Sequence, residues 1–222
     1  ILTAMTDNAI FDADVVIAGG GLAGLTLPLA MEQVGLSVAI VDALPLDARL
    51  DPKFDGRSSA LAFTSWRMFE AIGVADHLRP HTQRIEHIMV CDGRPYGGLK
   101  PGGPGADILH FDRTEISDGP DGEPLGWMAE NRHSRHALLS AIEKRDRITS
   151  IAPVRAKHYE ERPGGIDLIL EDGRYLSAKL LVACDGKFSR LRKQAGIRTF
   201  GWNYGQKGVV ATVQHTEPHN GV

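Results

Sequence analysis

The chain has 222 residues, of which 42% are hydrophobic and 24% are charged, and its formal net charge is -3. These values are typical of a folded globular protein, and they exclude an intrinsically disordered chain and a strongly basic nucleic-acid-binding domain. The two cysteines, Cys91 and Cys184, belong to no CxxC motif. Neither a disulfide framework nor a zinc site built on cysteine is therefore predicted, and a reducing cytoplasm is expected.

The first predicted unit is a strand, a glycine-rich turn and a helix. Residues 15–18 form a short apolar run typical of a buried strand, and residues 22–34 place apolar side chains at helical spacing before Gly35. Residues 37–41 predict a second apolar strand. A β-α-β unit of this kind builds parallel sheet. The longest uncharged run, residues 15–31, is too short for a membrane span and is assigned to this unit.

Both helices and strands are predicted in the rest of the chain. Helices are expected over residues 59–72, 131–144 and 189–195, and a polar loop over residues 44–56. Strands are expected over residues 85–93 and 107–112, on either side of a glycine- and proline-rich loop, and then over residues 153–160, 165–170, 174–178, 180–184 and 207–215. Asp172 and Gly173 predict a hairpin turn.

A glycine motif lies where the first strand meets the first helix. Gly19, Gly21 and Gly24 satisfy the pattern GxGxxG. In such a turn the first glycine permits a tight bend, the second lets a diphosphate approach backbone N–H groups, and the third lets helix and strand pack closely. Leu22 and Ala23 complete the first helical turn, whose unpaired N–H groups favour a phosphate.

An acidic residue follows the second predicted strand. Asp42 stands where a carboxylate accepts hydrogen bonds from the ribose of an adenosine. Its charge would repel a 2′-phosphate, so FAD or NAD is expected here in preference to NADP. Many glycine-rich loops merely turn the chain, but the strand, the helix and the acid together favour dinucleotide binding. This unit alone does not choose between FAD and NAD.

A second acidic turn, Asp185-Gly186, follows the apolar segment 180–184, at a strand end where open α/β sheets place their ligands. In this segment, LLVACDGKFSRLR, the chain resembles the group A flavoprotein monooxygenases, which are FAD-dependent aromatic hydroxylases. The segments DGRSSALAFTSWRMFEAIGV, which contains Arg57, and ENRHSRHALLSAI, which contains Arg132, also resemble this family. With HTEPHNGV near the end, the chain is similar to the UbiH/Coq6 branch of ubiquinone-biosynthesis hydroxylases over residues 14–222.

This resemblance implies an α/β fold in which a Rossmann-like FAD-binding domain, with a parallel sheet and a β-meander, occupies residues 1–205. A substrate-side segment would be inserted at about residues 80–130, and residues 206–222 would start the β-sheet of a substrate domain. FAD is expected to contact Arg57, Arg132, Asp185 and Gly186 in addition to the glycine turn and Asp42. The family's third motif, a Gly-Asp, is absent from the 222 residues. A piece of a longer protein, inactive by itself, is therefore expected.

The resemblance also implies a reaction. NAD(P)H would reduce FAD, the reduced flavin would add O2 to give a C4a-hydroperoxide, and a polyprenylated phenol of ubiquinone biosynthesis would attack the distal oxygen. Because the flavin performs this chemistry, no catalytic side chain is predicted. NAD(P)H is expected to visit the flavin transiently. The apolar tail of such a phenol implies peripheral contact with the inner membrane or with other ubiquinone-pathway proteins.

Several alternatives stay open. A halogenase or prenyl reductase would share the first two motifs, and an NAD-dependent dehydrogenase would explain the glycine turn and Asp42 but not Asp185-Gly186. A non-catalytic flavin-fold module is a further alternative. Arg57 could be an ordinary surface arginine. His133 and His136 lie three residues apart but lack a third ligand, so no metal is expected. Trp66, Met68 and Phe69 are expected in the core.

Overall fold

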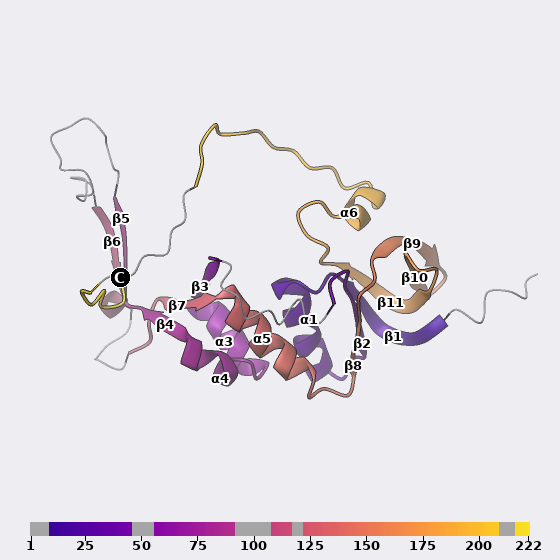
Figure 1. Ribbon diagram of the computed structural model, residues 1–222, viewed down its shortest axis with the longest axis horizontal. Helices are drawn as coiled ribbons and strands as arrows, with labels where there is room; N and C mark the ends of the chain where they lie inside the picture. Colours follow the sequence, from indigo (N-terminus) through magenta and orange to yellow (C-terminus); the bar gives the residue numbers. More distant parts are fainter. Residues whose placement is uncertain (1–8, 46–55, 92–107, 117–121, 209–215) are drawn as a thin grey trace, which may run out of the picture.

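The computed structural model describes residues 9–45, 56–91, 108–116, 122–208 and 216–222 (Figure 1). Its largest sheet has six strands in the order β8-β2-β1-β11-β10-β9. The first four strands run parallel, and β10 and β9 continue from β11 as an antiparallel meander. The predicted α/β fold with a parallel sheet and a β-meander is confirmed. The bounds are β1 (Ala9–Ala18), β2 (Val38–Val41), β8 (Ile148–Ile151), β9 (Ala156–Arg162), β10 (Gly165–Leu170) and β11 (Tyr175–Ala183).

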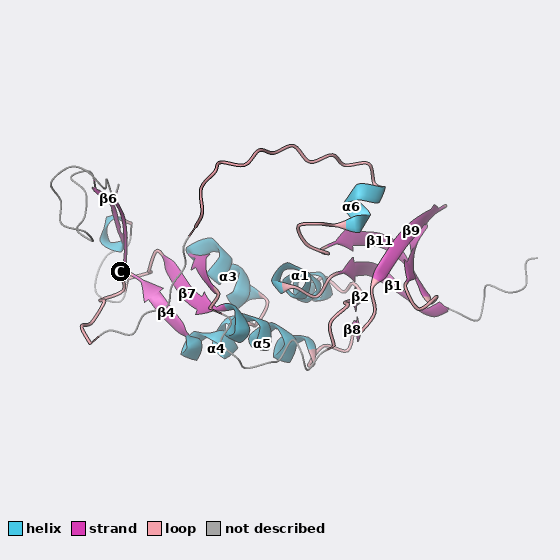
Figure 2. Cartoon of the chain, turned by 45° about the horizontal axis from the view of Figure 1, so that its top comes forward, coloured by secondary structure: helices cyan, strands magenta, loops and turns pink. Residues whose placement is uncertain are grey.

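Helix α1 (Leu22–Gln33) connects β1 to β2 and packs against α5 (Asn131–Ile142). A smaller sheet has the order β3-β7-β4, and β5 and β6 form a separate antiparallel hairpin. Figures 1 and 2 both show this hairpin at the end of the molecule remote from the six-stranded sheet. The remaining bounds are β3 (Ser58–Ala62), α3 (Phe63–Ala71), α4 (Ala75–Leu78), β4 (Thr82–Ile85), β5 (His87–Cys91), β6 (Ile108–Asp112), β7 (Gly126–Glu130) and α6 (Arg190–Gln194), with short 3-10 turns at Arg79–His81 and Arg113–Glu115.

Strand β1 is buried on both faces. Val15 and Ile17 pack under α1, whereas Val16 and Ala18 pack on the opposite face with residues of the meander such as Leu168. Parallel strands that are covered on both sides read as continuous apolar runs, which is why this strand and β2 could be recognised in the sequence. The long uncharged run thus lies in β1 and α1, and no helix within the described ranges is long and apolar enough to cross a bilayer.

The helix predicted over residues 59–72 is wrong in its first part. Ser58–Ala62 is strand β3, which pairs antiparallel with β7, and the helix α3 begins only at Phe63. Alanine and leucine in this segment favour a helix locally, but the backbone hydrogen bonds to β7 decide the conformation. Trp66 and Phe69 are buried as predicted, whereas Met68 is 42% exposed and is not a core residue.

The two strands predicted over residues 174–178 and 180–184 are in fact one strand, β11. It pairs with β1 from Tyr175 to Ala183. The charged Lys179 does not interrupt this strand, because its ammonium group lies 2.6 Å from the carboxylate of Asp14 on β1. The edge strand β8 and the strand β7 were missed, since each is short and carries a polar or glycine residue within its apolar pattern.

Other local predictions are confirmed. Helix α1 ends at Gln33, as the apolar spacing indicated, and Gly35 follows with a positive φ of 85°. The hairpin turn at Gly173 has φ of 89° and joins β10 to β11. Three predicted segments lie mostly or wholly outside the described residues: the strand expected over residues 207–215, of which only residues 207 and 208 are described and are not in a strand, the glycine- and proline-rich loop before β6, and the loop at residues 44–56.

Candidate functional site

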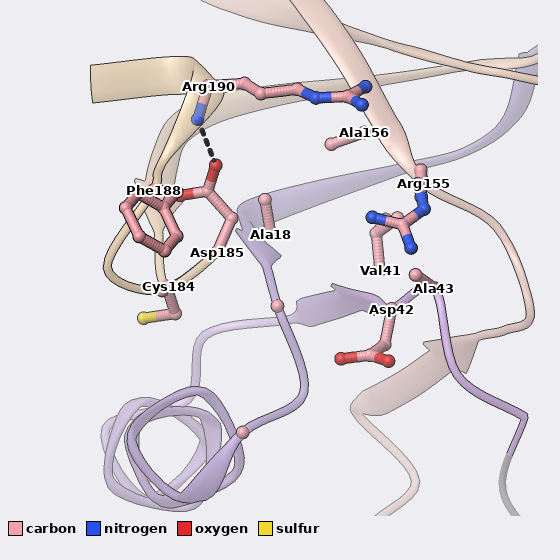
Figure 3. Close-up of a pocket in the computed structure, with 13 residues that line it drawn as sticks. Ala18, Val41, Asp42, Ala43, Arg155, Ala156, Cys184, Asp185, Phe188 and Arg190 are labelled. Atoms are coloured by element: carbon pink, nitrogen blue, oxygen red, sulfur yellow. Dashed lines mark hydrogen bonds between the residues drawn. The ribbon is translucent and has the colours of Figure 1, made fainter. Parts of the chain in front are cut away.

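A cavity of about 460 Å³ lies at the carboxyl ends of β1, β2 and β11. Gly19, Gly21, Asp42, Asp185 and Gly186 all line it. Three backbone hydrogen bonds hold the strand ends together: the N–H of Gly19 donates to Val41 (2.7 Å), that of Cys184 to Ala18 (2.7 Å), and that of Asp42 to Ile151 (3.1 Å). Segments far apart in the sequence therefore meet at one edge of the sheet, as expected for ligand sites in open α/β sheets (Figure 3).

The three glycines of the turn meet different steric limits. A Cβ on Gly19, which has φ of 110°, would collide with the carbonyl of Cys184, and a Cβ on Gly24 would collide with the carbonyl of Gly19. A Cβ on Gly21 would have no heavy atom within 4 Å. Gly19 and Gly24 thus allow close packing of the protein on itself, whereas Gly21 leaves open space above the backbone.

Gly21 is also the N-cap of α1, and it offers no side chain to satisfy the first N–H groups of that helix. The first turn, with Leu22 and Ala23, contains no acidic residue. Its unpaired N–H groups and the positive end of the helix dipole are therefore available to an anion. Open space and available donors at one point suit a diphosphate.

Asp42 is fixed against the glycine turn. One carboxylate oxygen accepts a hydrogen bond from the N–H of Gly20, and the other accepts one from the N–H of Leu44 at 2.7 Å. A carboxylate has about four lone-pair sites and can therefore accept hydrogen bonds from several donors. A ligand hydroxyl in the cavity could use that capacity.

Asp185 lies across the cavity from Asp42 (Figure 3). Its Oδ2 accepts the N–H of Arg190 at 2.8 Å, at the start of α6. Its Oδ1 is buried and has no hydrogen-bond partner among the described residues. A buried carboxylate oxygen without a partner is costly, so this atom suits a hydroxyl donated by a ligand. Gly186, with φ of 91°, permits the turn that follows.

Arg57 and Arg132 do not line this cavity. They lie near each other at the junction of β7 and α5, where the N–H of Asn131 donates to the carbonyl of Arg57 at 3.0 Å. Arg57 is exposed, and the guanidinium of Arg132 pairs with Glu130 at 2.6 Å. Their contact with a flavin nucleotide stays a prediction.

Arg155 lines the cavity but was not predicted from the sequence. The preceding residue, Val154, donates its N–H to the carbonyl of Asp42 at 2.8 Å, which places Arg155 beside the acid (Figure 3). Within the described part of the chain, the guanidinium of Arg155 makes no hydrogen bond or ion pair. Arg190 also lines the cavity, but its guanidinium pairs with Glu171 at 2.9 Å. No motif marks Arg155, because the β8–β9 connection reaches the cavity only in the folded chain.

Cys184 ends the apolar run and is half-buried rather than fully buried. Burial raises the pKa of its thiol, and the neighbouring Asp185 carboxylate raises it further. The thiol therefore stays protonated at neutral pH and is a poor nucleophile.

The amino-acid sequence matches known proteins along nearly its whole length. Residues 12–220 match the family model described as FAD binding domain. The chain is 37% identical over 219 residues to a ubiquinone hydroxylase, UbiL, of Rhodospirillum rubrum, and the match covers 98% of this chain and 47% of that protein. It is 29% identical to the 3-demethoxyubiquinol 3-hydroxylase of Escherichia coli, over 90% of this chain and 48% of the relative. The chain thus spans about half the length of these relatives.

Solved structures share the fold. The anhydrotetracycline hydroxylase OxyS from Streptomyces rimosus superposes with a TM-score of 0.65 at 17% identity, over 87% of this chain and 36% of that one. The flavin-dependent monooxygenase PieE, solved with FAD and substrate, gives a TM-score of 0.65 at 20% identity, over 87% of this chain and 34% of that one. At these identities the likeness concerns the fold alone.

Proposed function

The chain belongs to the family of FAD binding domains, and on this premise we propose that the cavity at the sheet edge holds FAD as part of a flavin-dependent hydroxylase of ubiquinone biosynthesis. FAD is the cofactor that the family binds. The observation that carries the proposal is that Gly19, Gly21, Asp42 and Asp185, drawn from three strand ends, line one cavity. An NAD-dependent dehydrogenase would leave the second acidic turn without a role.

The donors and acceptors of the cavity suit distinct parts of FAD. In the proposed complex, the open backbone at Gly21 and the first N–H groups of α1 hold the diphosphate, with Gly24 permitting the close turn. Asp42 accepts hydrogen bonds from the adenosine ribose. The Oδ1 of Asp185, which no described residue hydrogen-bonds, accepts a hydrogen bond from a hydroxyl of the ribityl chain. Arg57 and Arg132 are proposed to lie against the flavin nucleotide.

The residues of this chain bind and orient the cofactor. When bound, FAD supplies the redox and oxygen chemistry of a hydroxylase, with NAD(P)H proposed as the reductant and O2 as the oxidant. No side chain of the cavity is assigned a nucleophilic step, because the thiol of Cys184 has a raised pKa. The main task of the chain is to fix the cofactor and to keep its position relative to the strand ends.

The substrate class and the partners are proposed from the relatives. Two relatives are named a ubiquinone hydroxylase and a 3-demethoxyubiquinol 3-hydroxylase, so a polyprenylated phenol is proposed as substrate of the whole protein. We propose a cytoplasmic enzyme, and the apolar tail of such a phenol favours peripheral contact with the inner membrane or association with other ubiquinone-pathway proteins. We also propose a division into an FAD-binding domain, residues 1–205, and the start of a substrate domain, residues 206–222. The separation of the β5–β6 hairpin from the large sheet supports an inserted segment near residues 80–130.

The test uses the whole protein that contains this chain. A flavin absorption spectrum, NAD(P)H oxidation stimulated by a prenylphenol, and a product heavier by one oxygen atom would support the proposal. Halogenated or saturated products would instead indicate a halogenase or a prenyl reductase, and absence of any turnover would indicate a non-catalytic flavin module. Asp185→Asn should weaken FAD binding, whereas Asp172→Asn, in the exposed turn between β10 and β11, should not.

A further inference from the structure

The β5–β6 hairpin carries a cluster of three potential metal ligands, His87, His110 and Asp112. In the antiparallel register His87 is directly opposite Asp112, and His110 is opposite Met89. Side chains alternate between the two faces of a strand, so His87, Met89, His110 and Asp112 share one face. Among the described residues, these three are the group of potential metal ligands whose ligand atoms all lie close to one another. The hairpin is remote from the proposed FAD site (Figures 1 and 2).

The distances between the ligand atoms match those around a tetrahedral metal ion. His110 Nε2 lies 3.2 Å from His87 Nδ1, and His87 Nδ1 lies 3.4 Å from an Asp112 carboxylate oxygen, Oδ2. All three atoms lie within 4.8 Å of one another. Two donor atoms bound to tetrahedral zinc at about 2.1 Å are about 3.4 Å apart, so the three atoms need little movement to share one ion.

Two contacts within this cluster compete for one ring nitrogen, Nδ1 of His87. A neutral His87 carries either a proton on Nδ1, which it can donate to Asp112, or a lone pair, which accepts a proton from His110. It cannot do both. A cation accepts a lone pair from each of the three ligands and removes this conflict.

A neighbouring residue already orients the carboxylate. Asp112 Oδ1 accepts hydrogen bonds from the N–H of Thr114 at 2.8 Å and from its hydroxyl at 2.7 Å. The other oxygen, Oδ2, is thereby directed at the histidines. Supporting hydrogen bonds of this kind orient metal ligands and raise affinity.

We propose that His87, His110 and Asp112 bind one divalent transition-metal ion, with Zn²⁺ as the best-suited species and water completing its coordination. Two imidazoles and one carboxylate suit zinc, cobalt and nickel better than magnesium or calcium, which prefer oxygen ligands. Because its ligands come from both strands, the ion would connect β5 to β6. It would thereby stabilise a two-stranded hairpin, which is only marginally stable by itself. The histidines come from two different strands, 23 residues apart in the chain, so their proximity cannot be read from the sequence.

The test is titration of the untagged 222-residue chain with Co²⁺, followed by competition with Zn²⁺. We expect one Co²⁺ per chain, visible absorption bands of a low-coordinate site, and their loss when Zn²⁺ displaces cobalt. His110→Ala and His87→Ala should each lower the affinity by at least tenfold, in line with the loss of a metal ligand. His158→Ala on β9 and His133→Ala on α5 should leave it unchanged.

Circular dichroism and FAD titration of the same variants separate loss of the site from loss of the fold. Because the hairpin is remote from the cavity, both should be unchanged in His110→Ala. Absence of the visible bands in the unaltered chain would overturn the proposal, as would equal affinity for Co²⁺ in His110→Ala. Loss of binding in His133→Ala with retention in His110→Ala would also overturn it.

Discussion

At the scale of single residues, the glycine turn shows that one motif contains two kinds of constraint. Gly19 and Gly24 are required by the protein itself, because a Cβ at either position would overlap a backbone carbonyl. Gly21 is not required by the protein, because a Cβ there would project into open space. If the proposed site is correct, Gly21 is required by the ligand alone, and stability and affinity should separate at these positions.

The first prediction compares Gly21→Ala with Gly24→Ala. In Gly24→Ala the new methyl group meets the carbonyl of Gly19 and forces helix and strand apart, so the free energy of unfolding should fall by about 1–3 kcal/mol or more. Gly21→Ala should change it by less than about 1 kcal/mol, since alanine is only a weaker N-cap. Its dissociation constant for FAD should nevertheless rise at least about tenfold, or about 1.4 kcal/mol. Urea unfolding and FAD titration measure the two effects. Unchanged FAD affinity in Gly21→Ala would contradict the proposed place of the diphosphate.

Arg155 gives a second prediction. Its guanidinium has no partner in the described part of the chain and lies beside Asp42, so it can bind the adenosine end of FAD without breaking another contact. Arg155→Ala should weaken FAD binding by about 1.5–3 kcal/mol if it donates a charge-assisted hydrogen bond. The matched control is Arg174→Ala, because Arg174 pairs with Asp172 in an exposed turn outside the cavity. Equal affinities for FAD in the two variants would show that Arg155 does not contribute to FAD binding.

His133 gives a prediction about pH. Burial lowers the pKa of His133, and the stacked ring of His81, with centroids 4.2 Å apart, lowers it further. Glu130 opposes this shift, while Arg132 and His136 add to it. The unfolded chain, in which a histidine has a pKa of about 6.5, therefore takes up this proton first as the pH falls. The contribution of this residue to stability should thus fall as the pH drops below about 6.5. Once the pH is below the folded pKa, the loss should not increase further.

The measurement is urea unfolding at pH 7.5 and at pH 5.0. His133→Gln should lose less stability than the unaltered chain over that interval, because its side chain takes up no proton. His158→Gln, on β9 and outside this group of side chains, is the control and should behave like the unaltered chain. The same pH dependence in all three proteins would contradict the assignment.

At the scale of elements, the smaller sheet is held to its helices by a pair of tryptophans. Trp66 on α3 and Trp127 on β7 stack with centroids 4.3 Å apart, and Trp66 is 1% exposed. Its indole N–H donates to Glu70 at 2.9 Å. Strand β3, which lies where the start of a helix was predicted, therefore pairs with β7 beside a packed core and not on a free surface.

Trp66→Ala should lower the free energy of unfolding by about 3–5 kcal/mol, because it removes a fully buried tryptophan and leaves a cavity under β7. Met68→Ala, on the exposed side of the same helix, should change it by no more than about 0.5 kcal/mol. Denaturant titration followed by circular dichroism compares the two. A small effect of Trp66→Ala would mean that the smaller sheet contributes little to the stability of the chain.

At the scale of the whole molecule, the chain corresponds to about half of its relatives, and the cavity is formed at one edge of one sheet. The 222-residue chain by itself is expected to bind FAD weakly and to hydroxylate nothing. Isothermal titration should give a weaker affinity for it than for the whole protein, and FAD should be lost on gel filtration. Stoichiometric FAD retained by the chain, together with coupled formation of a hydroxylated product, would contradict this expectation.

The sequence by itself determined the parts whose causes are local. The strand, glycine turn, helix and acid from β1 to Asp42 follow one another along the chain, so sterics and apolar periodicity specify them without long-range information. The same holds for the turn at Gly173 and for most of α5. The resemblance to FAD-dependent hydroxylases also rests on short contiguous segments, and the family match confirms it.

Only the tertiary structure decided which distant residues meet. Pairing of β1 with β11 joined Asp185 to the glycine turn, a hydrogen bond to Asp42 set Arg155 beside the acid, and β7 turned Ser58–Ala62 into a strand. The cluster on β5 and β6 depends likewise on strand register. Backbone hydrogen bonds between segments far apart in the chain cause each of these results, and local propensity carries no record of such bonds.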